Sequence, residues 1–324
     1  MPPSRQRYAC SLVKYTKSLS DACRTPSEYL LVMAFEITTN TVHANGIDFA
    51  YLECGTGPLA LCLHGFPDSA HSWRHLMPAL AEAGFHAIAP FTRGYAPTSV
   101  APDGIYQTGA LSADANALHE ALGGDGDAVI IGHDWGAPSA YGAAASAPER
   151  WKRVVGMAVP PGAAMGAAFI NNLEQTKRSW YMFYFQHPLS DMVVPANDLA
   201  FIDMLWRDWS PHYDGVIDSE NCKACLRDPA HMSAALGYYR ATLGTGARSE
   251  KYDAIQAAGG GELPQPTLYL HGLDDGCIGT EVAEAASAMC SWATIAFVEG
   301  AGHFMQLEKP QEVNKLIIDW ITAK

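Results

Sequence analysis

Short apolar runs, separated by stretches with helical patterning, recur along the chain from about Thr41 onward. Runs of this kind are typical of strands buried in a parallel sheet. They cover residues 59–65, 86–92, 128–133, 153–160, 266–272 and 294–300, and helices are expected at 111–122, 137–146, 281–289 and 311–322. Alternating strands and helices predict an α/β fold, in which a mostly parallel central sheet carries helices on both faces.

Residues 162–246 interrupt this alternation. They are helical in pattern and rich in aromatic residues, and they contain no clear strand. An insert between two strands would lie over the carboxyl ends of the sheet, where open α/β sheets bind ligands. We therefore expect an extension at 1–33, a core in two segments at 34–161 and 256–324, and a helical insert at 162–255.

The extension at 1–33 is more basic than the rest of the chain, and strand patterning begins only after Met33. No small-residue cleavage site follows its short apolar run, so it does not fit a targeting peptide. We expect a poorly ordered tail, with Met33 as an alternative start of the protein.

The net charge of −13 disfavours nucleic acids and anionic membranes as partners. No apolar run approaches the roughly 20 residues that a membrane-spanning helix needs. The eight cysteines come without a signal peptide, so we expect reduced thiols and a cytoplasmic protein. Cys222 and Cys225 have metal-ligand spacing, but no second pair follows them, and no phosphate-binding glycine motif is present. We therefore expect neither a metal nor another cofactor.

Residues 129–142, with the sequence VIIGHDWGAPSAYG, place a carboxylate at the top of a predicted buried strand. Asp134 is flanked, two positions away on each side, by Gly132 and Gly136. This pattern matches the sharp strand-to-helix turn of α/β-hydrolases, where a strained nucleophile tolerates only small residues beside it. Taken alone, the pattern fits equally well an aspartate that caps the following helix.

Later residues supply the partners that a nucleophile at Asp134 requires. In α/β-hydrolases an acid follows a later strand and a histidine follows the next one, in that order along the chain. Asp274 and Asp275 follow the next-to-last predicted strand, and His303 follows the last one. The spacing in that family places the acid three residues after the glycine that ends the strand, which favours Asp275 over Asp274.

An aspartate nucleophile is already ionised at neutral pH, because its usual pKa is about 4. It can attack a carbon that bears a leaving group and form an ester with it. A histidine such as His303 would then take a proton from the water that hydrolyses this ester. That attack creates an oxyanion, for which backbone N–H groups are the expected partners. The HGFP stretch follows an early strand, and we assign the N–H groups of Phe66 and Trp135 to this role.

Several motifs, in order along the chain, carry a more specific resemblance. They are HGFPDSAHSW, RGYAPTS, GHDWGAP, HGLDDGCIG and GAGHFMQLEKP. From about Thr41 to its end, the chain resembles the epoxide hydrolases of the α/β-hydrolase superfamily. The resemblance implies that the insert is the cap domain of that family and that Asp134 forms the ester. It also implies that Asp275 and His303 activate the water that hydrolyses this ester.

Epoxide hydrolases also use two cap tyrosines that donate hydrogen bonds to the epoxide oxygen. By resemblance, the first is Tyr181 at the start of YMFYFQ, with Tyr184 as the alternative. The second is Tyr239 in GYYR, with Tyr238 as the alternative. An opening epoxide leaves an alkoxide, which a phenol with a pKa of about 10 can protonate. Aromatic packing within the cap would explain the same tyrosines without a catalytic role.

Other functions are compatible with parts of this pattern. Haloalkane dehalogenases share the aspartate nucleophile but carry asparagine at the position of Phe66, and haloacetate dehalogenases carry arginine at the position of Trp135. A neutral, aromatic pocket fits an uncharged epoxide better. A non-catalytic ligand-binding protein on this fold would lack one of Asp134, Asp275 and His303, which are all present. We therefore expect a small uncharged epoxide and water as partners, and the sequence leaves a homodimer open.

Overall fold

The computed structural model describes residues 35–323, so the predicted extension at 1–33 lies outside the described residues. The strands are β1 (Thr38–Ala44), β2 (Ile47–Cys54), β3 (Leu59–Leu63), β4 (His86–Pro90), β5 (Val129–His133), β6 (Arg153–Met157), β7 (Thr267–Gly272) and β8 (Ala293–Val298). Within the described residues they form an eight-stranded sheet of order β1-β2-β4-β3-β5-β6-β7-β8. β2 pairs antiparallel with β1 and β4, and the remaining pairings are parallel. The predicted α/β fold with a mostly parallel sheet is confirmed.

Helices lie on both faces of this sheet and beyond the carboxyl ends of its parallel strands. Those that alternate with the other strands are α1 (Leu76–Glu82), α2 (Thr108–Ala121), α3 (Gly136–Ser146), α12 (Thr280–Met289), α13 (Met305–Glu308) and α14 (Pro310–Thr322). Those between β6 and β7 are α4 (Ala164–Asn171), α5 (Leu173–Arg178), α6 (Trp180–Tyr184), α7 (Ser190–Val193), α8 (Ala196–Trp209), α9 (Val216–Leu226), α10 (Pro229–Leu243) and α11 (Asp253–Ala258). Short 3-10 helices span Ala70–Trp73 and Glu250–Tyr252.

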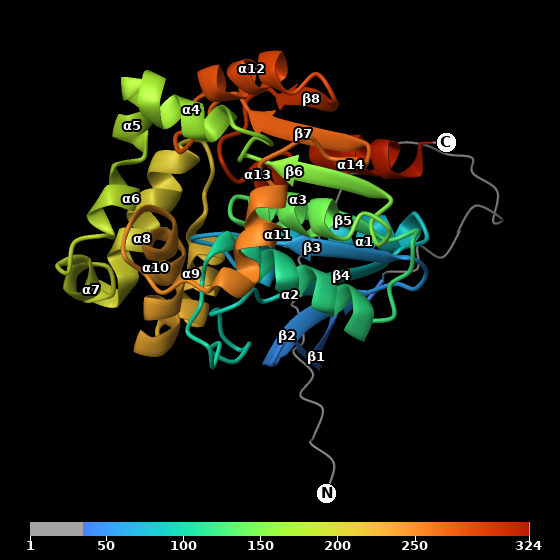
Figure 1. The fold of residues 1–324 in the computed structure, drawn as a ribbon, viewed down its shortest axis with the longest axis horizontal. Helices are drawn as coiled ribbons and strands as arrows, with labels where there is room; N and C mark the ends of the chain where they lie inside the picture. The colour runs from blue at the N-terminus through green and yellow to red at the C-terminus, as the bar shows by residue number, and fades with distance from the viewer. Residues whose placement is uncertain (1–34, 324) are drawn as a thin grey trace, which may run out of the picture. The chain divides into compact units, whose positions relative to one another are not determined.

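The side chains of the central strands alternate between two apolar layers. In β3, Leu59, Leu61 and Leu63 pack in the layer that also holds the apolar side chains of α2 and α3. Ala60 and Cys62 pack in the opposite layer, with those of α1 and α14. Figure 1 shows α2, α3 and α11 in front of the sheet. Burial on both faces explains why these strands are nearly continuous apolar runs in the sequence.

Helices α4 to α10, which make up most of the stretch between β6 and β7, lie beyond the carboxyl ends of the parallel strands. Figure 1 shows α4 to α10 gathered at the side toward which the arrows of β6 and β7 point. Residues 197–199 of α8 have positive φ, so the regular part of that helix runs from there to Trp209. The expected boundary between 255 and 256 falls inside α11, which packs against α2 and α3. The division of the chain into core and cap domains remains a prediction.

Several observed strands end earlier than the apolar runs that predict them. β3 ends at Leu63 rather than at residue 65, and β6 ends at Met157 rather than at residue 160. The apolar character continues because the following loops are also buried, as Phe66 and Ala158 are. These buried loops at the carboxyl edge of the sheet carry the residues of the site. In residues 35–323, no helix combines the length and the apolar character that crossing a membrane requires.

Candidate active site

Asp134 lies at a sharp turn between β5 and α3. Its φ is 52°, a left-handed conformation that costs a residue with a side chain roughly 1–2 kcal/mol. A Cβ on Gly132 would lie 2.1 Å from the carbonyl oxygen of Gly136, and a Cβ on Gly136 would lie 2.0 Å from that of Leu63. The tight turn therefore requires both glycines. The helix-capping explanation of Asp134 is wrong, because the N-cap residue of α3 is Trp135, and the Oδ1 of Asp134 accepts from the N–H of Phe66.

The Asp134 carboxylate lies against the loop that follows β3. Its Oδ1 accepts a hydrogen bond of 2.7 Å from the backbone N–H of Phe66. Gly65 passes so close that a Cβ there would lie 2.2 Å from this oxygen and 2.4 Å from the backbone nitrogen of Trp135. The two N–H groups that the sequence assigns to an oxyanion therefore border the same carboxylate. The N-terminus of α3 adds the positive end of its helix dipole at this point.

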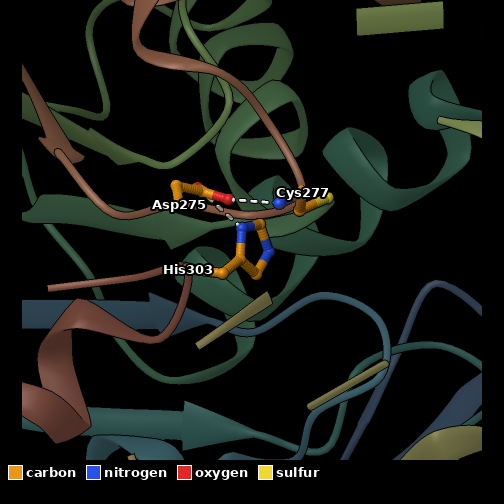
Figure 2. A group of neighbouring side chains, drawn as sticks. All are labelled: Asp275, Cys277 and His303. Atoms are coloured by element: carbon orange, nitrogen blue, oxygen red, sulfur yellow. Dashed lines mark hydrogen bonds and ion pairs between the residues drawn. The ribbon is translucent and has the colours of Figure 1, made fainter. Parts of the chain in front are cut away.

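Asp275 and His303 form a buried pair that joins the loops after β7 and β8. The Nδ1 of His303 lies 2.9 Å from Oδ2 of Asp275. Figure 2 marks this contact with a dashed line. The other oxygen of Asp275 accepts hydrogen bonds from the backbone N–H groups of Cys277 and Ile278, at 2.7 and 2.9 Å. Because Nδ1 faces a carboxylate, it carries the proton in the neutral ring, and Nε2 is the atom available as a base.

The structure separates the two candidate acids. The side chain of Asp274 is 41% exposed and lies 3.9 Å from His212 at the surface. The side chain of Asp275 is fully buried against His303. Of the two neighbours, Asp275 is therefore the one that can orient the histidine.

His303 lies between two carboxylates. Its Nε2 is 3.5 Å from Oδ2 of Asp134, on the side opposite Asp275. Burial by itself lowers the pKa of His303, but the charges of Asp275 and Asp134 outweigh burial and raise the pKa to about 10. Burial likewise raises the pKa of Asp275, but the charge of His303 outweighs it and holds that pKa below its usual value. At neutral pH the resting site therefore holds an imidazolium, which becomes a base only after one neighbouring charge is removed.

Removal of the Asp134 charge is expected to lower the pKa of His303. An opposite charge at this distance shifts a pKa by about one to three units. In Asp134→Asn, the imidazole should therefore titrate well below the wild-type value of about 10 in an NMR titration of its ring protons. An unchanged pKa of His303 in the variant would contradict the ion pair.

The raised pKa of His303 also makes the stability of the folded protein depend on pH. Protonated His303 stabilises the folded state fully at pH values below the pKa of about 6.5 that it has in the unfolded chain, and this stabilisation is lost as the pH rises through the pKa in the folded protein. In Asp134→Asn the same loss should occur at lower pH.

A cavity of about 380 Å³ lies beside the turn at Asp134. Asp134 and Trp135 form one part of its wall, and Tyr181 of α6 and Tyr239 of α10 form another. Asp134 is the one lining residue, among those the structure describes, whose side chain is charged. The volume falls within the usual range for small-molecule sites. The cavity is therefore suited to a small uncharged molecule held next to a carboxylate.

Tyr181 and Tyr239 both line this cavity and pack edge to face, with ring centres 5.6 Å apart. The buried hydroxyl of Tyr239 has no hydrogen-bond partner within residues 35–323. The hydroxyl of Tyr181 lies 3.3 Å from Sγ of Cys277. Burial above all, together with nearby negative charge such as that of Asp134, raises the pKa of both phenols well above the usual value. Both side chains therefore stay protonated and can donate hydrogen bonds.

The two alternative tyrosines lie outside the cavity. The hydroxyl of Tyr238 donates to the backbone carbonyl of Arg93. Tyr184 stacks on Phe201, with ring centres 6.0 Å apart. The geometry therefore favours Tyr181 and Tyr239 over their neighbours.

Comparison with known proteins identifies the family of this chain. The family model for the alpha/beta hydrolase fold matches residues 58–310. The chain belongs to the α/β-hydrolase family.

Individual relatives are similar over most of their length. The AB hydrolase superfamily protein YfhM of Bacillus subtilis is 30% identical over 288 residues, which cover 86% of this chain and 96% of the relative. Epoxide hydrolase A of Mycobacterium tuberculosis is 28% identical, with 88% of this chain and 98% of the relative covered. The crystal structure of Bacillus megaterium epoxide hydrolase in complex with an inhibitor is similar with a TM-score of 0.73 and 25% identity, and 88% and 100% of the two chains are covered.

This α/β-hydrolase brings Asp275, Cys277 and His303 close together, with ligand atoms within 4.8 Å of one another (Figure 2). Such a spacing would suit a metal ion. However, hydrogen bonds already occupy both oxygens of Asp275 and the Nδ1 of His303. Burial also raises the pKa of the Cys277 thiol, so that it stays protonated and is a poor ligand. The group is better explained as an acid–base pair with a neighbouring thiol.

Sequence reasoning did not find several contacts of this α/β-hydrolase site. Cys277 contacts Tyr181, and Glu308 accepts a hydrogen bond from the backbone N–H of Gly302. Both residues lie in motifs that mark the site, but no spacing rule assigns them a role. Ser210 bonds to Glu308 at 2.7 Å from the helical insert, and no feature of the sequence indicates this contact.

Proposed function

We propose that this α/β-hydrolase converts a small uncharged epoxide and water into a vicinal diol through an ester on Asp134. Relatives from Mycobacterium tuberculosis and Bacillus megaterium carry the name epoxide hydrolase, so at the family level the activity is epoxide hydrolysis. The observation that carries the detailed proposal is one cavity in which a carboxylate meets two protonated phenols, those of Tyr181 and Tyr239. That set matches the two needs of epoxide opening, which are a nucleophile and a proton donor.

In the first step, Oδ2 of Asp134 attacks one epoxide carbon, and the bond from that carbon to the epoxide oxygen breaks. The N–H of Phe66 holds Oδ1, which therefore becomes the carbonyl oxygen of the ester. The epoxide oxygen leaves as an alkoxide and takes a proton from Tyr239 or Tyr181. Ester formation removes the charge of Asp134, so the pKa of His303 falls. The proton that His303 then releases replaces the one that the tyrosine gave up.

In the second step, Nε2 of His303 takes a proton from water, and the resulting hydroxide attacks the ester carbonyl carbon. Negative charge develops on Oδ1, next to the N–H groups of Phe66 and Trp135. Each such donor lowers the activation free energy by on the order of 3 kcal/mol. The intermediate collapses, the alkyl oxygen leaves with the second proton of the water, and the diol departs. Asp134 is restored with an oxygen atom from the water.

The lining of the cavity favours an epoxide over a halide as the leaving group. A halide ion needs no proton, whereas the alkoxide of an opened epoxide does. The two dehalogenase families considered use an asparagine or an arginine, and neither residue type lines this cavity in residues 35–323. The phenols of Tyr181 and Tyr239 take their place.

Incubation of the purified protein with a panel of uncharged aryl and alkyl epoxides tests the proposal. Vicinal diol should form above the background rate and should be lost in Asp134→Asn. A single turnover in water enriched in heavy oxygen tests the ester, because the first diol takes its oxygen from Asp134 and should be unlabelled. A labelled first diol, or no diol from any epoxide with folded protein, would contradict the proposed function.

Loss of the Tyr239 phenol is expected to slow ester formation more than loss of the Tyr181 phenol. The hydroxyl of Tyr181 is shared with Cys277, whereas that of Tyr239 has no competing partner in the described chain. We expect Tyr239→Phe to lose roughly a hundred- to ten-thousand-fold in rate, Tyr181→Phe to lose less, and the double variant to lose nearly all activity. Rapid-mixing measurements of ester formation give these rates, and Tyr184→Phe is the matched control outside the cavity. Wild-type rates in both single variants would rule out the two tyrosines as proton donors.

A further inference from the structure

Residues 206–210, at the end of α8, lie against the loops that carry the acid and the histidine. The carbonyl oxygen of Trp209 accepts hydrogen bonds from the backbone N–H groups of Gly276 and His303, at 3.1 and 3.0 Å. Gly276 directly follows Asp275 in the chain. One backbone carbonyl of the helical insert therefore joins both halves of the acid–base pair.

Two glycines make this close approach possible. A Cβ on Gly276 would lie 2.1 Å from the carbonyl oxygen of Asp208. A Cβ on Gly302 would lie 2.7 Å from the carbonyl oxygen of Trp209. Any larger residue at either position would move the insert away from the catalytic loops.

Ser210 extends this contact with its side chain. Its hydroxyl donates to Oε1 of Glu308 at 2.7 Å and accepts from the backbone N–H of Phe304 at 3.1 Å. The second oxygen of Glu308 accepts from the backbone N–H of Gly302 at 2.9 Å. The residues on both sides of His303 are thus held by one serine–glutamate pair.

We propose that Ser210 and Glu308 are positioning residues for His303, and that the helical insert controls the hydrolysis of the ester through them. The proposal rests on the proposed function, in which His303 activates water in the second step. Neither residue lines the cavity, so neither contacts the substrate there. Displacement of a general base by about an ångström can cost about a hundredfold in rate. Ester formation depends instead on Asp134 and the tyrosines, and it should keep its wild-type rate.

Two substitutions of Glu308 separate its position from its charge. Glu308→Gln keeps the length of the side chain but has no charge. Its amide oxygen can accept from the N–H of Gly302, and its NH₂ group can donate to the hydroxyl of Ser210. Glu308→Asp keeps the charge, but it is one methylene shorter and cannot span both partners. We expect Glu308→Gln to hydrolyse the ester at about the wild-type rate and Glu308→Asp to be roughly ten- to a hundredfold slower. Single-turnover kinetics, with the ester-bearing protein measured by mass spectrometry after acid quenching, give both rates.

Ser210→Ala tests the same contact from the side of the insert. It leaves Glu308 and the Phe304 N–H without their partner, so the ester should accumulate while ester formation keeps its rate. Ser219→Ala is the matched control, because Ser219 is also buried on the insert, and within residues 35–323 its hydroxyl donates to the nearby carbonyl of Val216 and not to a catalytic loop. Wild-type kinetics are expected for that control.

The positioning role is overturned if Glu308→Asp hydrolyses the ester at the wild-type rate. If Glu308→Asp does not fold, the same result in Ser210→Ala overturns it. Slow hydrolysis in Glu308→Gln also overturns it, because it would assign the effect to the charge. His303→Gln distinguishes this failure from that of the proposed function. If His303→Gln traps no ester, the ester mechanism fails and the positioning role fails with it. If His303→Gln traps the ester while Glu308→Asp hydrolyses its ester at the wild-type rate, the positioning role fails but the ester mechanism stands.

Discussion

Replacement of Asp134 by asparagine is expected to abolish diol formation, with a loss of about 10⁴-fold or more. An amide carries no charge and does not form the ester. Its side chain has nearly the size of aspartate, and its oxygen can still accept the hydrogen bond from Phe66. The variant should therefore fold normally, and the loss should lie in the chemical step. The measurement is the rate of diol formation per folded protein with an aryl epoxide that the wild type accepts.

Asp274→Asn is the matched control for this substitution. Asp274 follows the same strand as Asp275, but its side chain is partly exposed and lies near His212. Its activity should stay close to that of the wild type. An asparagine at a strained turn can deamidate to aspartate, so the intact mass of Asp134→Asn must be checked before and after the assay. Full activity in protein that has not deamidated would exclude Asp134 as the nucleophile.

Replacement of His303 by glutamine is expected to stop the reaction after the ester has formed. The nucleophile and the two tyrosines remain, so the first step can proceed once. Without the imidazole, no base takes the proton from water, and ester hydrolysis should slow by about 10⁴-fold. Mass spectrometry should then find the protein heavier by the mass of one epoxide molecule, with the adduct on Asp134.

His212→Gln provides the comparison for this variant, because His212 lies at the surface near Asp274 and makes no contact with Asp134. It should turn over normally and carry no more adduct at steady state than the wild type. Peptide mapping after proteolysis distinguishes an adduct on Asp134 from non-specific alkylation elsewhere. Unmodified His303→Gln after exposure to a good substrate would contradict the two-step mechanism.

Features that depend on local constraints could be predicted from the sequence. The alternation of apolar runs and helical stretches predicts the mostly parallel sheet, because buried strands and amphipathic helices have different periods. Gly132 and Gly136 mark the turn at Asp134, since the backbone there leaves no room for a Cβ. The exact ends of the strands could not be predicted, because the loops that follow them are buried and equally apolar.

The choice among neighbouring candidates required the structure. Asp274 and Asp275 are adjacent in the sequence, but one side chain is partly exposed and the other faces His303. Tyr238 and Tyr239 likewise point to different surroundings on α10. Resemblance to a family favours one member of each pair, but the direction of a side chain follows from the packing of its helix or loop.

The sequence by itself determined the sheet, the turn that carries Asp134 and the order of the acid and the histidine. Each follows from residue types at short, regular spacing. Only the tertiary structure decided which distant segments meet at these residues. Ser210 and Glu308 are 98 positions apart, yet they hold the loop of His303 together. Their contact depends on how the end of α8 packs over the sheet, and burial and backbone hydrogen bonds set that packing without leaving a periodic pattern in the sequence.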